Sequence, residues 1–284
     1  MKKILLLLLF WVSYAHADVT LIIPFSPGGA HDTVGRKFSS FLETELGTPI
    51  NVINVTGAGG LIAINKLTAS NATTMMLTSS SFYTNILDNQ LDIDQFKYIS
   101  VLAESPLYLG VKKGAGITCS TITNSSKDQF LGSSGPGSIS SFATSIVSSK
   151  YKHIIDVPYK GSGQMITDIL SGQISGTFYN SIPERTDIEI IAATTLNPVY
   201  GIPGMKECFG IQTNLKTQFV LVANKKADVT FMKTINESAI KYTKDQAVNN
   251  HFKTQGMIAT ADSLDETAKE VNREYKIWAK KGKN

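Results

Sequence analysis

The feature that most constrains this chain is an apolar segment that breaks into a glycine-rich turn and continues at once as a helix. Leu21 to Ile23 suit a buried strand, Pro24 to Gly29 suit a tight loop, and the apolar residues after Asp32 recur at helical spacing. Glycines let a ligand approach the main chain, and the first turn of a helix adds N–H groups that have no intrahelical partner. The stretch therefore predicts a place where an anion such as a carboxylate can bind.

The same succession of strand, loop and helix recurs along the chain. Four further loops follow strand candidates, namely Thr56 to Gly60, Ser79 to Ser81, Gly132 to Ser138 and Tyr159 to Gly163. In open α/β sheets the loops at the carboxyl ends of the strands gather around one crevice, so these loops could line one binding site. A single Gly/Ser turn of this kind is more often only a connection between a strand and a helix. The pattern predicts an α/β fold.

The first 17 residues read as a secretory signal peptide. Lys2 and Lys3 precede an apolar run from Ile4 to Val12, and the small residues Ala15-His16-Ala17 end it, so we expect a mature chain from Asp18. The apolar run is shorter than the roughly 20 residues that span a bilayer. We therefore expect a soluble exported protein. We also expect it to be a monomer.

Charge and composition exclude one class of partner. The formal net charge is +4, and two of the positive charges lie in the predicted signal peptide, which leaves about +2 on the mature chain. The short basic tail from Lys280 to Lys283 is typical of a solvated helix end. A nearly neutral chain without clusters of lysine and arginine does not suit nucleic acid, and no such partner is expected.

Two apolar runs in the middle of the chain suggest where it changes domain. The runs Tyr98 to Ala103 and Leu107 to Val111 read as strands, and the polar, glycine-rich exit at Gly114 predicts a crossing into a second domain. The apolar strand Gln218 to Ala223 predicts the return, near Thr217. This gives one domain from residues 18–115 plus 218–284 and another from residues 116–217, with hinges at the two crossings.

Two cysteines, Cys119 and Cys208, remain in a compartment that permits disulfides, and we expect them to pair. The alternative is two buried thiols. Asp32 suits an N-cap that satisfies the first-turn N–H groups as well as it suits contact with a ligand. His31 beside it is expected to be exposed.

Catalytic and metal-binding patterns are weak, so neither a cofactor nor a metal is expected. The sequence Gly132-Ser133-Ser134-Gly135 is not a nucleophile elbow, because Pro136 stands where the last glycine of that motif belongs. The histidines are far apart in the sequence, without the spacing of a zinc site. One alternative remains open, an exported hydrolase for a small anion that uses Ser134 or Ser138 with His153.

Three motifs in order resemble one known family. They are Pro24-Phe25-Ser26-Pro27-Gly28-Gly29 with Asp32 and Arg36, then Gly57-Ala58-Gly59-Gly60, then Val157-Pro158-Tyr159-Lys160-Gly161-Ser162-Gly163 with Asp168. Together they resemble the tripartite tricarboxylate transporter receptor family, also called Bug-type periplasmic solute-binding proteins. The resemblance implies a two-lobed, type II periplasmic binding-protein fold, with a mixed sheet flanked by helices in each lobe. It also implies a receptor that closes on a small organic acid, such as a di- or tricarboxylate, and delivers it to membrane permease subunits.

The resemblance also implies site residues. One carboxylate would be held by two loops, largely through the N–H groups of Ser26 to Ala30, and the rest of the ligand would meet residues of the opposite side. The implied ligand-binding residues are Phe25, Ser26, Gly28, Gly29, Ala30, Asp32, Gly57, Ala58, Gly59, Gly60, Ser79, Ser80, Gly135, Ser138, Tyr159, Lys160 and Asp168. For Asp168 a capping or surface role is an equal alternative.

Two departures from the family pattern affect the expected ligand. Thr56 stands where the family usually has proline, and Thr73-Thr74-Met75 stands where it usually has Asp-Gly-Tyr. The second change precedes the loop from Ser79 to Ser81 and could alter it. A sensory subunit that hands its closed form to a signalling receptor would use the same lobe surface, so the sequence leaves this role open beside transport.

Overall fold

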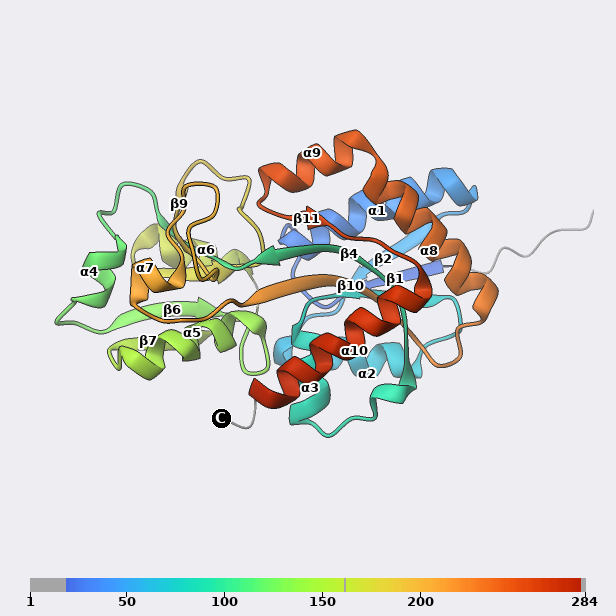
Figure 1. Ribbon diagram of the computed structural model, residues 1–284, viewed down its shortest axis with the longest axis horizontal. Coiled ribbons are helices and arrows are strands. Elements are labelled where there is room, and N and C mark those ends of the chain that lie inside the picture. The colour runs from blue at the N-terminus through green and yellow to red at the C-terminus, as the bar shows by residue number, and fades with distance from the viewer. Residues whose placement is uncertain (1–18, 161, 282–284) are drawn as a thin grey trace, which may run out of the picture.

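The computed structural model describes residues 19–160 and 162–281, so the predicted signal peptide lies outside the described residues. The chain forms two lobes, each built on one β-sheet with helices on its faces (Figure 1). We call the lobe that contains the first strand lobe 1 and the other lobe 2. This mixed α/β architecture confirms the predicted fold class.

The sheet of lobe 1 has six strands. In order across the sheet they are β11 (Ile258–Ala259), β4 (Phe96–Pro106), β10 (Lys216–Asn224), β3 (Thr74–Thr78), β1 (Val19–Ile23) and β2 (Ile50–Asn54). Strand β1 runs parallel to both β2 and β3, whereas β10 runs antiparallel to β3 and β4. The helices of this lobe are α1 (Ala30–Leu46), α2 (Leu61–Ala69), α3 (Ser81–Asp88), α8 (Val229–Lys244), α9 (Gln246–Thr254) and α10 (Leu264–Lys281), with short 3-10 turns η1 (Ala58–Gly60) and η2 (Ile93–Gln95).

The sheet of lobe 2 has five strands. In order they are β7 (Ile154–Pro158), β6 (Gln129–Ser133), β8 (Gly176–Tyr179), β5 (Tyr108–Lys112) and β9 (Ile188–Ala193). Strand β6 runs parallel to β7 and β8, and β5 runs antiparallel to β8 and β9. The helices of this lobe are α4 (Cys119–Thr123), α5 (Ile139–Lys150), α6 (Ser162–Ser171) and α7 (Met205–Phe209).

Apolar spacing explains how these elements pack. Leu21, Ile22 and Ile23 of β1 are all fully buried, because the parallel strands of lobe 1 carry helices on both faces. On one face, Val34 and Phe38 of α1 are fully buried in the same apolar cluster as residues of α8. This packing fixes the loop between β1 and α1 at the carboxyl edge of the sheet.

The first crossing between the lobes differs from the sequence-based prediction. Strand β5 hydrogen-bonds with β8 and β9 in the sheet of lobe 2, although the predicted boundary at residue 115 placed it with lobe 1. The crossing therefore falls at Leu107, between β4 and β5, and not near Gly114. The chain returns to the first sheet where β10 begins, at Lys216. The two apolar runs were recognised as separate strands, but their membership of different sheets depends on pairing with β8 to β10, which are distant in the sequence.

Two further links tie distant segments together. Cys119 and Cys208 form a disulfide between α4 and α7, as expected, with a sequence separation of 89. The C-terminal helix α10 reaches toward lobe 2 (Figure 1). There the ring of Trp278 packs edge-on against Phe142 of α5, with ring centroids 5.0 Å apart. No helix of residues 19–160 and 162–281 is both long and apolar enough to cross a bilayer.

Candidate functional site

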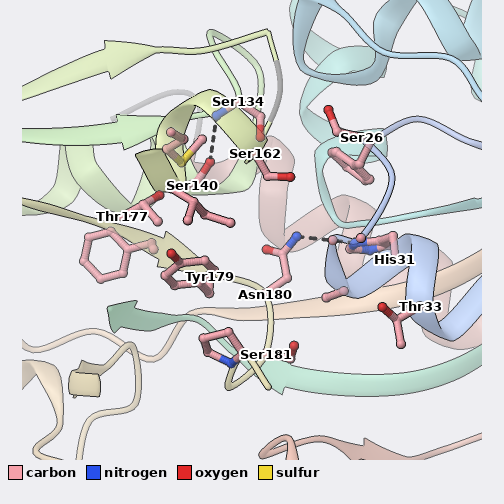
Figure 2. A pocket seen from close by; sticks show the side chains of 18 of the residues that line it. Ser26, His31, Thr33, Ser134, Ser140, Ser162, Thr177, Tyr179, Asn180 and Ser181 are labelled. Atoms are coloured by element: carbon pink, nitrogen blue, oxygen red, sulfur yellow. Dashed lines mark hydrogen bonds between the residues drawn. The ribbon is translucent and has the colours of Figure 1, made fainter. Parts of the chain in front are cut away.

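A cavity of about 410 Å³ lies between the two lobes. In lobe 1 its wall comes from the β1–α1 loop, the start of α1 and the β2–α2 loop, and in lobe 2 from the ends of β6, β7 and β8 (Figure 2). The residues that line it include Phe25, Ser26, Gly28, Gly29, Ala30, His31, Gly57, Gly59, Gly60, Ser134, Ser140, Lys160, Tyr179, Asn180, Glu184, Arg185 and Gln255. The cavity thus forms where the carboxyl ends of the parallel strands of both sheets meet, as this topology dictates.

The start of α1 presents main-chain donors to the cavity. The N-cap is Gly29, which has no side chain to cap the helix, so the first-turn N–H groups have no intrahelical acceptor. Two N–H groups of the preceding loop are already used, because Gly28 donates to Asp32 Oδ2 at 2.9 Å and Gly29 donates to the Ser26 carbonyl at 3.4 Å. The N–H donors predicted at Ser26 to Ala30 are therefore displaced toward Ala30 and His31.

Asp32 does not line the cavity, but its hydrogen bonds hold the loop between β1 and α1 in place. Besides Gly28, its carboxylate accepts hydrogen bonds from Arg36 Nε at 3.0 Å and Asn54 Nδ2 at 2.9 Å. Asn54 Nδ2 also donates to the Phe25 carbonyl at 2.9 Å, so the network joins both ends of the loop. Burial raises the pKa of Asp32, but the hydrogen bonds from Arg36, Gly28 and Asn54 outweigh it and lower the pKa below its usual value. Asp32 follows the N-cap by three residues, so it orders the helix start without being the N-cap.

His31 is buried, which corrects the expectation of an exposed side chain. The residue is only 2 % exposed. Its ring stacks on Phe219 of β10 with centroids 4.2 Å apart, and its centroid lies 4.6 Å from that of Phe25. Its Nδ1 lies 3.4 Å from Asn180 Nδ2 of lobe 2, and Figure 2 shows the two side chains pointing toward one another across the cavity. Burial lowers the pKa of His31 to about 3 and outweighs the opposing effect of the Thr78 backbone, so the imidazole is neutral at physiological pH.

The loop after β2 brings the lobes into direct contact. Gly57, Gly59 and Gly60 have φ angles of 123°, 62° and 109°, which favour glycine. A Cβ on Gly59 would lie 2.5 Å from the Pro136 carbonyl oxygen of lobe 2, so the two loops meet with no room for a side chain.

Hydroxyl groups of α3 complete this contact between the lobes. Ser81 Oγ accepts a hydrogen bond from the N–H of Ile139 in the first turn of α5, at 2.9 Å. Thr84 Oγ1 donates to the Gly137 carbonyl at 2.5 Å. Lobe 1 therefore supplies part of the cap of a lobe 2 helix. We call the contacts of Gly59, Ser81 and Thr84 with residues 136–139 the interlobe clasp.

The sequence-predicted site residues separate into two groups. Those that line the cavity are Phe25, Ser26, Gly28, Gly29, Ala30, Gly57, Gly59, Gly60 and Lys160. Those that lie outside its lining are Asp32, Ala58, Ser79, Ser80, Gly135, Ser138, Tyr159 and Asp168.

The second group has structural partners that account for its position. Ser79 and Ser80 are fully buried, and Ser80 Oγ accepts from the Gln218 N–H at 3.1 Å. Ser138 is the N-cap of α5, where its hydroxyl accepts from the Ser141 N–H. Tyr159 donates its hydroxyl to Asp168 at 2.7 Å, which ties the β7–α6 loop to its own helix. A ligand role for these residues stays a prediction.

Charged side chains in the lining stand at its outer edge. Lys160 is exposed, and the Glu184 side chain is 62 % exposed and accepts from Gln255 Nε2 at 2.8 Å. Arg185 forms two hydrogen bonds with the Asp187 carboxylate, at 2.9 and 2.7 Å. The inner part of the lining is therefore uncharged.

The end of β8 and the residues after it are the part of the site that the sequence analysis missed. Tyr179 and Asn180 line the cavity, and the Ile182 N–H donates to the Gln255 carbonyl of lobe 1 at 2.9 Å. The sequence does contain a signal, because the residues from Ile174 to Phe178 suit a strand and polar residues follow its carboxyl end. Loops at the carboxyl ends of strands were predicted to line the site, and that rule applies to these residues too, although they contain no glycine.

The hydrolase alternative has no geometric support. Ser134 and Ser138 follow the carboxyl end of β6, whereas His153 precedes the amino end of the parallel strand β7. His153 Nε2 lies 2.9 Å from the Ile122 carbonyl oxygen, and a five-residue strand is roughly 16 Å long. No group of acidic, cysteine and histidine side chains that could hold a metal ion occurs in the part of the chain that the structure describes.

Comparison with known proteins adds an independent finding. Residues 34–282 match the sequence profile described as the tripartite tricarboxylate transporter family receptor. Protein BugT of Bordetella pertussis is 23 % identical, over 94 % of this chain and 89 % of that protein.

Solved structures show the same fold. The structure of Rpa4515 from R. palustris with adipate superposes with a TM-score of 0.84 at 22 % identity, over 94 % of this chain and 96 % of that chain. MatC from Rhodopseudomonas palustris with bound malate gives a TM-score of 0.79 at 20 % identity, over 92 % of this chain and 97 % of that chain.

Proposed function

We propose that this chain, which belongs to the tripartite tricarboxylate transporter receptor family, captures a small carboxylate between its lobes and delivers it to a membrane permease of that transporter type. It would do so as a monomer in the periplasm, after removal of the signal peptide. It would act as a binding protein and not as an enzyme.

The observation that carries this proposal is the uncapped start of α1 at the wall of the cavity. An N-cap without a side chain leaves the N–H groups of Ala30 and His31 without an intrahelical acceptor, at the positive end of a 17-residue helix. A carboxylate placed there would accept from these groups, with Ser26 and the glycines of residues 57–60 beside it. No charged side chain is needed for this contact, which matches an inner lining without charge.

The solved relatives support the chemical class. One of them holds adipate and another holds malate, and both of these ligands carry carboxylates.

Thermal shift with a panel of organic acids tests the proposal. The panel contains di- and tricarboxylates, hydroxy acids, acidic amino acids and aromatic acids, and each acid is paired with its uncharged amide. An acid at 100 times its dissociation constant should stabilise the protein by about 2.7 kcal/mol, or roughly 5–10 °C for a domain of this size. The amides should give no shift. If no acid shifts the melting temperature or gives calorimetric heat, the receptor assignment is wrong.

Lobe closure is a second part of the proposal. The two crossings, at Leu107 and just before Lys216, would absorb the backbone rotation. Small-angle scattering should show a smaller radius of gyration when a saturating acid is present. Equal radii with and without a ligand of proven affinity would contradict the hinge motion.

A further inference from the structure

The two ends of the cavity differ in the charge that they can accept. The start of α1 offers main-chain donors, as described above. Beyond His31 the inner lining contains Tyr179 and Asn180 from the end of β8, and neither side chain carries a charge (Figure 2). A ligand that spans the cavity therefore meets an anion site at one end and an uncharged site at the other.

Buried polar atoms at the uncharged end have no partner within the protein. Among residues 19–160 and 162–281, neither the Tyr179 hydroxyl nor Asn180 Oδ1 makes a hydrogen bond, and both atoms are buried. Buried polar groups nearly always have a hydrogen-bond partner, so two buried polar atoms without one at the wall of a cavity indicate groups that can bind a ligand.

The neighbour of Asn180 fixes which of its atoms faces the ligand. The amide nitrogen Nδ2 lies 3.4 Å from His31 Nδ1. An amide nitrogen can only donate, so Nδ1 is the acceptor and the ring proton of the neutral imidazole is on Nε2. Asn180 Oδ1 is then left as a hydrogen-bond acceptor, and a carboxylate beside it would be repelled.

The positive charge that acts on this end is that of Arg185, and the charge of Asp187 opposes its effect on Tyr179. The charged side chains of the lining are Lys160, Glu184 and Arg185, and all three are exposed at the outer edge. Arg185 is already engaged by Asp187 through two hydrogen bonds. Burial raises the pKa of Tyr179 to about 12, so its hydroxyl keeps its proton and can both donate and accept.

On the basis of the proposed function, we propose that the ligand is a monocarboxylate whose opposite end carries an uncharged hydrogen-bond donor, a hydroxyl or a primary amide. Asn180 Oδ1 and the Tyr179 hydroxyl receive this donor, while the start of α1 holds the carboxylate. These two side chains are therefore specificity-determining residues.

Calorimetry with two matched series of acids at pH 7 tests the proposal. One series is 4-hydroxybutanoate, succinamate, succinate and butanoate, and the other is 6-hydroxyhexanoate, adipamate, adipate and hexanoate. Each series keeps the carboxylate and the chain length and changes only the far group. In at least one series the hydroxy acid or the monoamide should bind at least tenfold more tightly than the dicarboxylate and the alkanoate.

Variants show whether Asn180 and Tyr179 cause this preference. Asn180→Leu keeps the approximate size of the side chain without an acceptor, and it should reduce the tenfold preference to less than threefold. Tyr179→Phe should reduce the preference in the same direction. Asn197→Leu replaces an exposed asparagine of lobe 2 outside the cavity, and it should leave the preference unchanged. The readout is a ratio between ligands, so a general loss of stability or closure does not imitate it.

Two outcomes would overturn the proposal. In the first, a dicarboxylate binds most tightly in both series, or the preference for the hydroxy acid or the monoamide is unchanged in Asn180→Leu and in Tyr179→Phe. The proposed function would then stand, because an acid still binds. The other is that no member of either series binds, in which case this substrate class is wrong, and the broader acid panel decides separately whether the protein is a carboxylate receptor.

Discussion

Replacing His31 with glutamine should remove most of the acid sensitivity that this residue confers on the fold. The pKa of His31 is about 3 in the folded protein because the ring is buried, against about 6.5 in an unfolded chain. The unfolded state therefore binds a proton that the native state excludes, so native stability is lost as the pH falls from about 6.5 toward 3. Between pH 7.5 and 4.5 this linkage amounts to about 3 kcal/mol.

The assay is urea unfolding at a series of pH values, followed by circular dichroism. Wild type should lose about 3 kcal/mol more than His31→Gln between pH 7.5 and 4.5. The variant should start lower at pH 7.5, because it loses the stack on Phe219. His251→Gln serves as the matched control. This second histidine is less deeply buried, and although burial and Lys37 lower its pKa, Glu184 opposes the shift, so its replacement should change the slope much less.

A parallel loss of stability in wild type and His31→Gln would refute this reasoning. It would mean that the imidazole can take up a proton in the folded state, so that it is either exposed or paired with an acid. The assignment of Nδ1 as an acceptor from Asn180 would then lose its basis.

Three further predictions concern stability and closure. Asp32→Asn should lower the free energy of unfolding by about 2 kcal/mol at pH 7, because it weakens charged hydrogen bonds of a buried carboxylate. In urea unfolding, the difference between wild type and variant should become smaller below about pH 4, as the pH approaches the lowered pKa of Asp32. Gly59→Ala should weaken acid binding at least tenfold by calorimetry, because its Cβ would clash with lobe 2. The control is Gly47→Ala, which has the same φ of 62° and nothing within 4 Å of the new Cβ, and it should keep its affinity. Equal affinities of the two variants would contradict a closed-state contact at Gly59. The double change Cys119→Ser and Cys208→Ser should lower unfolding free energy by up to about 4–5 kcal/mol and leave binding intact, since neither cysteine lines the cavity, and an unchanged urea midpoint would contradict the role of the disulfide.

Local patterns in the sequence were sufficient for most elements of the fold. The strand expected from Tyr98 to Ala103 lies within β4, and the strand expected from Gln218 to Ala223 lies within β10. Such elements are specified by their own apolar spacing and by the turns beside them. The glycine-rich loops at the cavity were predictable for the same reason.

Features that depend on distant residues were not predictable. His31 looked like a loop residue beside Asp32, and its burial depends on Phe219, which is far away in the sequence. Ser79 and Ser80 belong to a loop of the expected kind, but the return of β10 beside β3 covers them. Asn180 lines the cavity because the second sheet directs the end of β8 toward the first lobe.

The interlobe clasp has a consequence for how such a receptor balances capture against release. Its hydrogen bonds join protein to protein, so they favour the closed form equally for every cargo and cannot discriminate between acids. They act as a common offset on affinity, because the observed dissociation constant rises as the closed fraction of the empty protein falls. A tenfold change in that fraction corresponds to about 1.4 kcal/mol, roughly the net contribution of one of these bonds. Loss of the Ser81 hydroxyl would therefore weaken capture of all cargo alike, whereas an additional bond would prolong retention and delay handover.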